Sequence, residues 1–308
     1  MRWLLFLLIT MIVILLALYW LYHSIFCNPE RNRPDAHNIP ESTLYKEHRE
    51  VMAEAVNDME STPFEEVSIL SADGYRLYGR LYIMEEAAPL MIFFHGYHGV
   101  YAWDGYGFFK ICKNNGINIL MVDERAHGKS GGNEVTFGIK ERYDCKLWVE
   151  YAAERFGENK DLLLAGVSMG ASSVIMASEL GFPQSVKAVI ADCGYSEPAS
   201  IIKEIIKKMK LPVEAVYMTV KISAQIFGHF NLEEAAALQA VKKIQIPILF
   251  IHGKNDSVVP VYMCNQLYEN CQSTGKLLII EGADHANSAM TDYEAYENAV
   301  VEFLKIIY

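Results

Sequence analysis

Short, wholly apolar runs alternate with amphipathic stretches along most of this chain. Runs that are apolar at every position fit strands buried on both faces, as in a parallel sheet covered by helices. Alternation of such runs with helical periodicity predicts a three-layer α/β fold. We expect eight strands, at 67–70, 77–83, 90–94, 117–122, 162–165, 186–190, 246–251 and 277–280.

The first two strands flank Asp73-Gly74, a dipeptide typical of tight turns, so we expect them to pair antiparallel. The interval 195–243 contains no strand-like run, and its part 232–241 is Ala-rich and reads as a helix. We interpret 195–243 as a helical lid inserted over the carboxyl edge of the sheet, where ligands bind in open α/β folds. The other helices are expected near 104–115, 138–157, 169–181, 260–272 and 289–307.

The longest apolar run stands at the N-terminus. Residues 3–22 include one polar residue, Thr10, and twenty helical residues span about 30 Å, enough to cross a bilayer core. We therefore predict an uncleaved transmembrane anchor over 1–26. A cleaved signal peptide and a buried core helix are the alternatives, but the run exceeds a usual signal core and no small-residue cleavage pattern follows it. Arginines lie on both sides of the run, so the side of the membrane stays open.

Residues 27–63 are expected to form a proline-containing linker followed by an amphipathic helix packed on the main domain. The apolar positions Leu44, Val51, Met52, Ala55 and Met59 recur at roughly helical spacing. The rest, 64–308, is then one α/β domain that contains the lid.

Composition and charge narrow the function classes. The chain has 308 residues, 52% of them hydrophobic, and 27 Lys and Arg against 38 Asp and Glu give a net charge of −11. This composition excludes a disordered chain and a small disulfide scaffold, and the negative surface disfavours nucleic acid as a partner. The six cysteines show no C-x-x-C or other metal-ligand spacing, so we read them as core thiols and expect no metal site.

The motif Gly166-Val167-Ser168-Met169-Gly170 has the form G-x-S-x-G and lies between a predicted strand and a predicted helix. A sharp strand-to-helix turn needs glycines, and it presents the serine hydroxyl at a helix N-terminus. An ordinary glycine-rich turn is the alternative, but the strand and helix on either side favour Ser168 as a nucleophile.

A serine nucleophile needs a histidine base and an acid that orients it, in the chain order Ser, acid, His for this architecture. Of the nine histidines, His285 follows the last strand and precedes the last helix, so it returns to the edge beside Ser168. Asp256, after strand 246–251, is the expected acid, with Asp192 at the end of strand 186–190 as its rival. We interpret Asp284 as a surface residue.

Acyl transfer also needs donors aimed at the developing oxyanion, usually two backbone N–H groups. Met169, directly after the nucleophile, is expected to supply one of them, and Tyr97 in the loop after strand 90–94 the other. Asp123 and Arg125, which follow strand 117–122, are interpreted as an internal ion pair or a loop brace. No metal or organic cofactor is needed for this chemistry.

Together these residues resemble the α/β-hydrolase superfamily over about 65–308. The motifs that carry the resemblance are 95–99 (HGYHG), 123–130 (DERAHGKS), 166–170 (GVSMG) and the segments of Asp256 and His285. Segment 123–130 is similar to a D-x-R-G-H-G-x-S loop of many members, with Ala126 where glycine is usual. The nearest subgroup resembles the membrane-anchored Bem46-like and bacterial exported hydrolases.

The resemblance implies a serine hydrolase, most often one acting on carboxylic esters (EC 3.1.1), with a small-molecule or lipid acyl substrate. An amidase or peptidase would use the same triad, and a catalytically silent, membrane-tethered binding module is a third possibility that intact Ser168, Asp256 and His285 argue against. The oligomeric state, like the substrate, is left open by the sequence.

Overall fold

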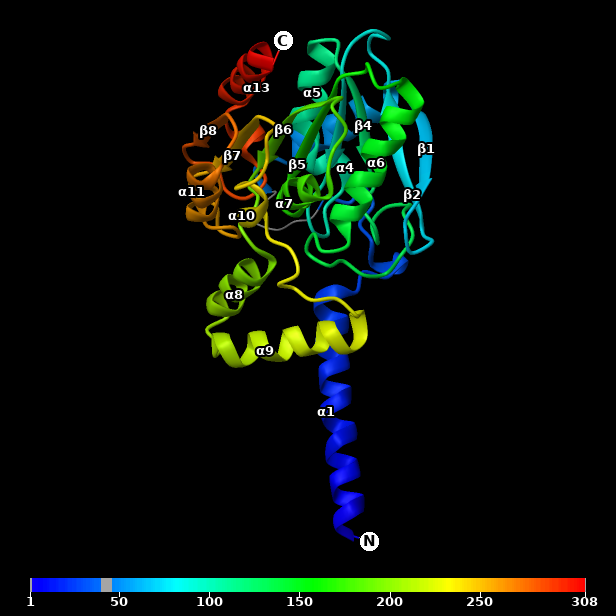
Figure 1. Ribbon diagram of the computed structural model, residues 1–308, viewed down its shortest axis with the longest axis vertical. Coiled ribbons are helices and arrows are strands. Elements are labelled where there is room, and N and C mark those ends of the chain that lie inside the picture. The colour runs from blue at the N-terminus through cyan, green and yellow to red at the C-terminus, as the bar shows by residue number, and fades with distance from the viewer. Residues whose placement is uncertain (1, 40–45, 308) are drawn as a thin grey trace.

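The protein is built around one eight-stranded sheet (Figure 1). A computed structural model describes residues 2–39 and 46–307. The strand order is β1-β2-β4-β3-β5-β6-β7-β8. The strands are β1 (Glu65–Leu70), β2 (Arg76–Tyr82), β3 (Leu90–Phe94), β4 (Asn118–Val122), β5 (Leu162–Val167), β6 (Val186–Asp192), β7 (Ile248–Gly253) and β8 (Gly275–Ile280).

The sheet has the topology expected from the apolar runs. β1 and β2 pair antiparallel around Gly74, whose φ is 88°, and β2 also pairs antiparallel with β4. The remaining neighbours, from β4 to β8, are parallel. The α/β-hydrolase fold with a mostly parallel eight-stranded sheet is thus confirmed. The carboxyl ends of the parallel strands meet at one edge, so the loops after β3, β5, β7 and β8 converge there.

Helices cover both faces of the sheet, and each layer has its own apolar core. One core joins the sheet to α6, α7 and α11, and the other joins it to α3, α4, α5 and α13. The helices are α1 (Arg2–Phe26), α3 (Arg49–Ser61), α4 (Tyr101–Asp104), α5 (Tyr106–Asn114), α6 (Glu141–Phe156), α7 (Met169–Ala177), α8 (Pro198–Lys208), α9 (Val213–Ser223), α10 (Ala237–Ala240), α11 (Val261–Asn270), α12 (Ser288–Thr291) and α13 (Tyr293–Ile307), with 3-10 turns η1 (Glu30–Asn32) and η2 (Ser178–Leu180) and a π-helical turn η3 (Ala224–Gly228).

Three predicted helices differ from the observed ones. The helix expected at 104–115 is divided at Gly105 into α4 and α5. The helix expected at 289–307 is divided at Asp292, whose Oδ1 accepts a hydrogen bond from the Ala295 N–H and so caps α13. In 232–241, only α10 is helical, because Asn231 Oδ1 binds the Glu233 N–H and forms a turn. Apolar spacing alone does not reveal such breaks.

The predicted amphipathic helix before the sheet corresponds to α3. Met52, Ala55 and Met59 are buried on its inner face, whereas Leu44 lies outside the described residues. Val51 is half-buried, so the predicted apolar positions within the described residues lie on or beside the inner face of α3.

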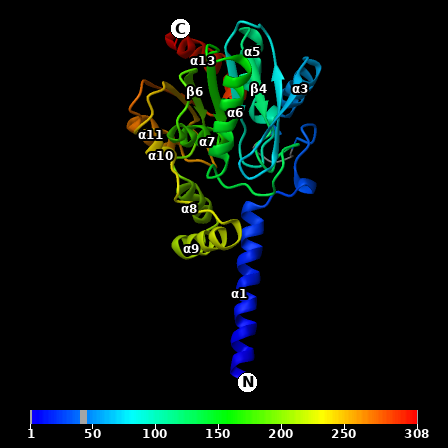
Figure 2. The ribbon, with the colours of Figure 1, turned by 45° about the vertical axis from the view of Figure 1, so that its right-hand side comes forward.

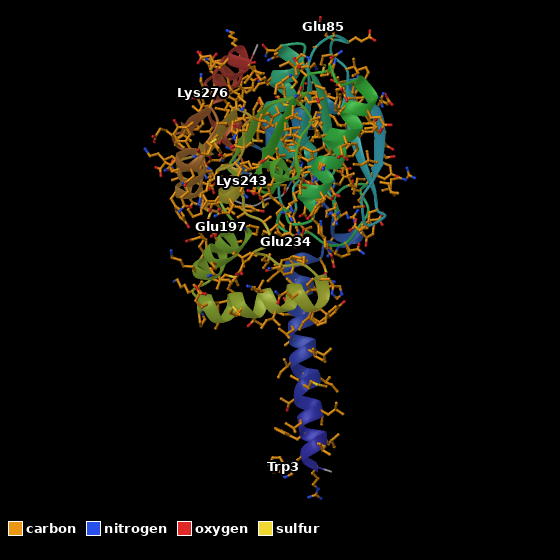
Figure 3. The ribbon with its side chains drawn as sticks, viewed as in Figure 1. Trp3, Glu85, Glu197, Glu234, Lys243 and Lys276 are labelled. Carbon is orange, nitrogen blue, oxygen red and sulfur yellow. The ribbon has the colours of Figure 1, made fainter. Side chains whose placement is uncertain are left out.

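The N-terminal helix α1 stands away from the domain for most of its length and is long and apolar enough to cross a membrane (Figures 1 and 3). Its last turns are different, because Tyr22 and Phe26 are buried. The Phe26 ring packs edge-on against Phe137 and Phe230, at centroid distances of 6.0 and 5.2 Å. Just beyond, the Asn28 side chain donates to the Ala126 carbonyl at 2.9 Å. The helix end is therefore part of the domain core.

The interval 195–243 is helical and contains α8, α9, η3 and α10. Helix α9 lies across α1 rather than along it, as Figures 1 and 2 show from two directions. The π-helical turn η3, directly after α9, also contacts α1, because the Phe227 ring packs on Tyr19 and Tyr22 at centroid distances of 5.3 and 5.8 Å.

Candidate active site

Ser168 occupies a strained turn between β5 and α7. Its backbone has φ 54° and ψ −113°, a conformation that non-glycine residues rarely adopt. The flanking glycines leave room for this turn, because a Cβ on Gly170 would lie 2.1 Å from the Phe94 carbonyl oxygen, and one on Gly166 would lie 2.5 Å from the Ala171 nitrogen. The G-x-S-x-G pattern therefore presents the serine at the start of α7 for steric reasons.

Ser168, His285 and Asp256 form one hydrogen-bonded chain. His285 Nε2 lies 2.9 Å from Ser168 Oγ, and His285 Nδ1 lies 2.8 Å from Asp256 Oδ2. The histidine comes from the loop between β8 and α12, and the aspartate from the loop between β7 and α11. The structure thus brings together, at the carboxyl edge of the sheet, the three side chains that the sequence singled out from separate loops.

Asp256 is held as a carboxylate. Burial on its own raises the pKa of Asp256, but hydrogen bonds from His252 and His285 outweigh it and lower the pKa well below its usual range. Its Oδ1 also accepts the Val258 and Val259 N–H groups, at 2.8 and 2.7 Å. The carboxylate is therefore ionised, and both of its oxygens are fixed.

The rival acids have other partners. Asp192 accepts a hydrogen bond from Ser288 Oγ at 3.3 Å, and its burial raises its pKa to about 6. Asp284 binds the Ser257 N–H at 2.6 Å and braces the loop that carries Asp256. The expected Asp123–Arg125 ion pair is not formed, because the Arg125 guanidinium pairs with other carboxylates, those of Asp73 and Asp144. Asp123 instead accepts the Lys129 N–H and braces its own loop.

The loop after β3 lies against the serine. A Cβ on Gly96 would be 3.3 Å from Ser168 Cβ, so this backbone borders the hydroxyl. Among residues 2–39 and 46–307, the Tyr97 N–H donates to no backbone acceptor, and Met169 begins α7, where helix N–H groups have no partner four residues back. In the part of the chain that the structure describes, neither N–H group has an assigned backbone acceptor. The Tyr97 hydroxyl points elsewhere and donates to the Ile25 carbonyl of α1 at 2.7 Å.

Comparison with known proteins places the chain in a family. The sequence profile described as the prolyl oligopeptidase family matches residues 109–306, a region that contains Ser168, Asp256 and His285. The chain belongs to the prolyl oligopeptidase family.

Relatives of this family member include hydrolases of known structure. It is similar to the uncharacterized protein YqkD of Bacillus subtilis, with 27% identity over 82% of this chain and 81% of that protein. The solved esterase Pf2001 of Pyrococcus furiosus has 27% identity and a TM-score of 0.64, covering 80% of this chain and 92% of the esterase. An uncharacterized membrane protein of Saccharomyces cerevisiae, YNL320W, has 25% identity over 52% of this chain and 51% of its own. These relatives support the α/β-hydrolase resemblance and a hydrolase activity.

Two buried histidines brace the loops after β3 and β4 in this family member. His95 Nε2 accepts the Glu124 N–H at 3.0 Å, and His127 Nε2 accepts the His98 N–H at 2.9 Å. Each Nδ1 faces a carbonyl oxygen, that of Gly96 or Arg125, at 2.8 Å. Because each ring accepts with one nitrogen and donates with the other, the neutral imidazole is required. Burial lowers the pKa of both rings.

Asp104 adds a further brace that sequence reasoning missed. Its Oδ2 accepts the Gly96 N–H at 2.7 Å. Burial raises the pKa of Asp104, opposed in part by His95. Asp104 lies in α4, and His127 lies in the loop after β4. The one sequence signal for these contacts is the His-Gly pattern of the loop after β3, whose backbone N–H groups need acceptors.

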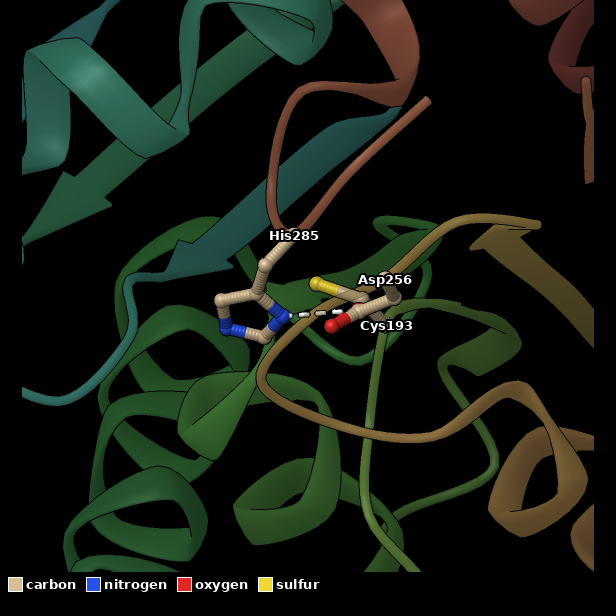
Figure 4. A group of neighbouring side chains, drawn as sticks. All are labelled: Cys193, Asp256 and His285. Atoms are coloured by element: carbon tan, nitrogen blue, oxygen red, sulfur yellow. Dashed lines mark hydrogen bonds and ion pairs between the residues drawn. The ribbon is translucent and has the colours of Figure 1, made fainter. Parts of the chain in front are cut away.

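Cys193 lies beside the His285–Asp256 pair (Figure 4), and the ligand atoms of the three residues are within 4.8 Å of one another. The thiolate, not the thiol, binds metals. Burial raises the pKa of the Cys193 thiol well above its usual value, and the nearby Asp192 and Asp256 carboxylates raise it further. The thiol therefore stays protonated and is a poor metal ligand, while His285 and Asp256 are already committed to each other.

The neutral histidines predict that stability falls in acid. Burial lowers the pKa of His127 in the folded protein, so below about pH 6.5 the unfolded chain binds more protons than the folded one. The stability that neutral His127 contributes above that pH is therefore lost as the pH falls. We expect His127→Gln, which keeps an acceptor and a donor but does not titrate, to reduce the acid-side slope of the unfolding free energy by about 1.4 kcal/mol per pH unit. Urea unfolding in detergent between about pH 5 and pH 7.5 measures it. Equal slopes in both proteins would refute a neutral His127.

Proposed function

We propose that this protein is a serine hydrolase that cleaves carboxylic esters. Ser168 is the nucleophile, His285 the general base and Asp256 the group that orients and stabilises the imidazolium. The observation that carries the proposal is the unbroken chain of hydrogen bonds from Ser168 Oγ through His285 to Asp256, at 2.9 and 2.8 Å. The Tyr97 and Met169 N–H groups are proposed to hold the oxyanion.

The reaction follows from these positions. Ser168 Oγ attacks the acyl carbon as its proton passes to His285 Nε2, and the carbonyl electrons move to the oxyanion, beside Tyr97 and Met169. Collapse expels the alcohol, which takes the proton from His285, and leaves an acyl-serine. Water then attacks as His285 removes its proton, and the acid is released with Ser168 restored. Asp256 keeps the proton on His285 Nδ1, so that Nε2 can accept.

An ester substrate is supported by the esterase among the solved relatives, of which this chain covers 92%. The name of the family, which refers to oligopeptides, favours a peptidase as the second candidate. The same triad serves both, but an amide needs a protonated leaving nitrogen. Turnover of a matched amide of the same acyl group separates the two. A peptidase hydrolyses the amide at a measurable rate, whereas an esterase hydrolyses only the ester.

We also propose that α1 anchors the protein in a membrane, that residues 27–63 link it to a catalytic domain at 64–308, and that 195–243 forms a lid. Burial of Phe26 supports an anchor that stays attached, because cleavage of a signal peptide would remove this side chain from the core. The membrane protein among the relatives supports it as well.

Covalent labelling tests the proposed function. We expect a fluorophosphonate probe to label the full-length chain at Ser168, and Ser168→Ala to abolish the labelling, because the probe reacts only with an activated serine. Ser173→Ala is the matched control, since Ser173 is a buried serine of the same helix whose hydroxyl donates to the Met169 carbonyl at 2.8 Å.

Labelling that survives Ser168→Ala would move the nucleophile elsewhere. A folded wild-type chain that takes up no probe would refute the activated serine altogether.

A further inference from the structure

An apolar stripe runs along the outward side of α9. The stripe begins at Leu211, just before α9, includes Met218 and Ile222 of α9, and ends at Ile226 of η3. These four residues recur at helical spacing and are each 41–48% exposed, and Ala215 between them is exposed as well. The opposite side of α9 is apolar too, because Tyr217 and Val220 are buried against the domain. A helix at a water-exposed surface places polar side chains outward. The exposed apolar side of α9 therefore indicates that it faces a second apolar surface, in addition to the domain.

The stripe is continuous with the exposed part of α1. Phe227 of η3, directly after α9, contacts Tyr19 and Tyr22 of α1, and α9 lies across α1 rather than along it (Figures 1 and 2). If α1 runs across a bilayer, α9 lies in the plane of that bilayer. Trp3 and Trp20 are about 26 Å apart along α1 at 1.5 Å per residue, close to the hydrocarbon thickness of about 30 Å. The crossing point therefore falls at the membrane boundary.

Charged groups fit the same position. Lys207, in the last turn of α8, and Lys210, just after α8, are exposed near Met209, which is 63% exposed. Lys207 also lies 3.5 Å from the Glu204 carboxylate. Basic side chains beside an apolar stripe are typical of helices that lie among lipid headgroups. On α9 itself, the exposed Glu214 is paired with Lys203 at 3.1 Å, which offsets its charge.

The loops that surround the candidate active site contact the α1 end and the α8–α9 segment. The loop after β3 bonds to the end of α1 through Tyr97, and the Val135 N–H in the loop after β4 donates to the Phe26 carbonyl at 2.8 Å. Lys208 of α8 donates to the carbonyls of Ser257 and Val258, directly after Asp256, at 2.6 and 2.8 Å. The end of α1 and the α8–α9 segment thus both lie against loops at the carboxyl edge.

We propose that the outward stripe of α9 is immersed in the membrane interface, so that the acyl substrate reaches Ser168 from the lipid phase. The chemistry implied is an ester that partitions into a bilayer. The proposal rests on the proposed anchor and hydrolase, and its occupant is the lipid surface rather than a second copy of the chain.

Fluorescence quenching tests the contact without any need for activity. The full-length chain, with Cys27→Ser and Cys271→Ser to remove the partly exposed thiols, is placed in phosphatidylcholine–phosphatidylglycerol vesicles and labelled with nitrobenzoxadiazole at Met218→Cys or Ile222→Cys. The control label is at Ile83→Cys, which is 49% exposed; Figure 3 places neighbouring Glu85 at the end of the domain away from α1. We expect shallow nitroxide lipids to quench the α9 labels at least about threefold more than the control.

Equal quenching by nitroxide lipids at both places would overturn the proposal. Labels shielded from iodide but unquenched by lipid would overturn it too, in favour of a second copy covering α9.

Substrate delivery is tested with two esters of one acyl group, one water-soluble and one embedded in the vesicle. We expect Met218→Glu with Ile222→Glu to lower the embedded-to-soluble rate ratio about tenfold, because two carboxylates resist immersion in lipid. Ile83→Glu with Ile306→Glu, on exposed apolar positions away from the lid, is the matched control and leaves the ratio unchanged.

An unchanged ratio in the α9 variant would overturn delivery from lipid. A wild-type chain inactive on both esters would refute the hydrolase, while the quenching result would still decide the contact.

Discussion

Replacing Ser168 by glycine is expected to abolish hydrolysis and to stabilise the fold at the same time. Loss of the nucleophile lowers kcat by about 10⁴–10⁶-fold, as does Ser168→Ala. The two variants separate in stability, because the φ of 54° and ψ of −113° suit glycine and strain alanine. Residues held in such regions cost of order 1–3 kcal/mol, so we expect Ser168→Gly to exceed Ser168→Ala in unfolding free energy by about that amount.

Hydrolysis of a p-nitrophenyl ester and urea unfolding, both with the full-length chain in detergent, measure the two effects. Ser173→Ala is the control for loss of a buried hydroxyl in α7 and should keep its rate within a few-fold. Equal stability of the glycine and alanine variants would show that the turn is not strained, and a retained rate in either would remove Ser168 from the mechanism.

The second large effect is expected for Asp256→Asn, which should lower kcat by about 10⁴-fold in a folded protein. The asparagine oxygen can still accept the Val258 and Val259 N–H groups, so the loop keeps its shape. Its amide nitrogen then faces His285 Nδ1 and donates to it. The histidine proton must move to Nε2, which can no longer accept from Ser168.

Asp192→Asn is the matched control, because Asp192 is a second buried carboxyl at the carboxyl edge and its side chain bonds to Ser288 rather than to His285. We expect its rate to stay within about tenfold of wild type. If Asp192→Asn lost more activity than Asp256→Asn, the orienting acid would be Asp192.

The parts of this fold that could be predicted from sequence are those in which one segment carries its own signal. Wholly apolar runs such as 90–94 and 162–165 indicate buried strands without reference to their neighbours. The G-x-S-x-G turn is similarly local, because Gly170 is required by contacts at 2.1 Å from the adjacent strand. Asp256 and His285 were selected by their order in the chain and by their position after parallel strands, whose carboxyl ends meet at one edge of the sheet.

What could not be predicted depends on contacts between distant segments. The acceptor for the His98 N–H is a histidine 29 residues later, and the acceptor for the Tyr97 hydroxyl lies 72 residues earlier, in α1. No local sequence pattern around His98 or Tyr97 indicates which distant residue is its hydrogen-bond partner. The helix break at Asp292 was missed for a related reason, because hydrophobic periodicity continues past a residue whose side chain caps the next helix.

The buried end of α1 also bears on how this protein can be cut. A protease acting just after Phe26 would remove an aromatic side chain that is fully buried among Phe137 and Phe230, and loss of such a side chain costs about 3–5 kcal/mol. The same cut would take the Ile25 carbonyl away from the Tyr97 hydroxyl, and the loop after β3 would lose that hydrogen bond. If α1 anchors the protein in a membrane, as proposed, shedding would act as an off-switch, because it would release a weakened protein rather than a soluble form of the same one.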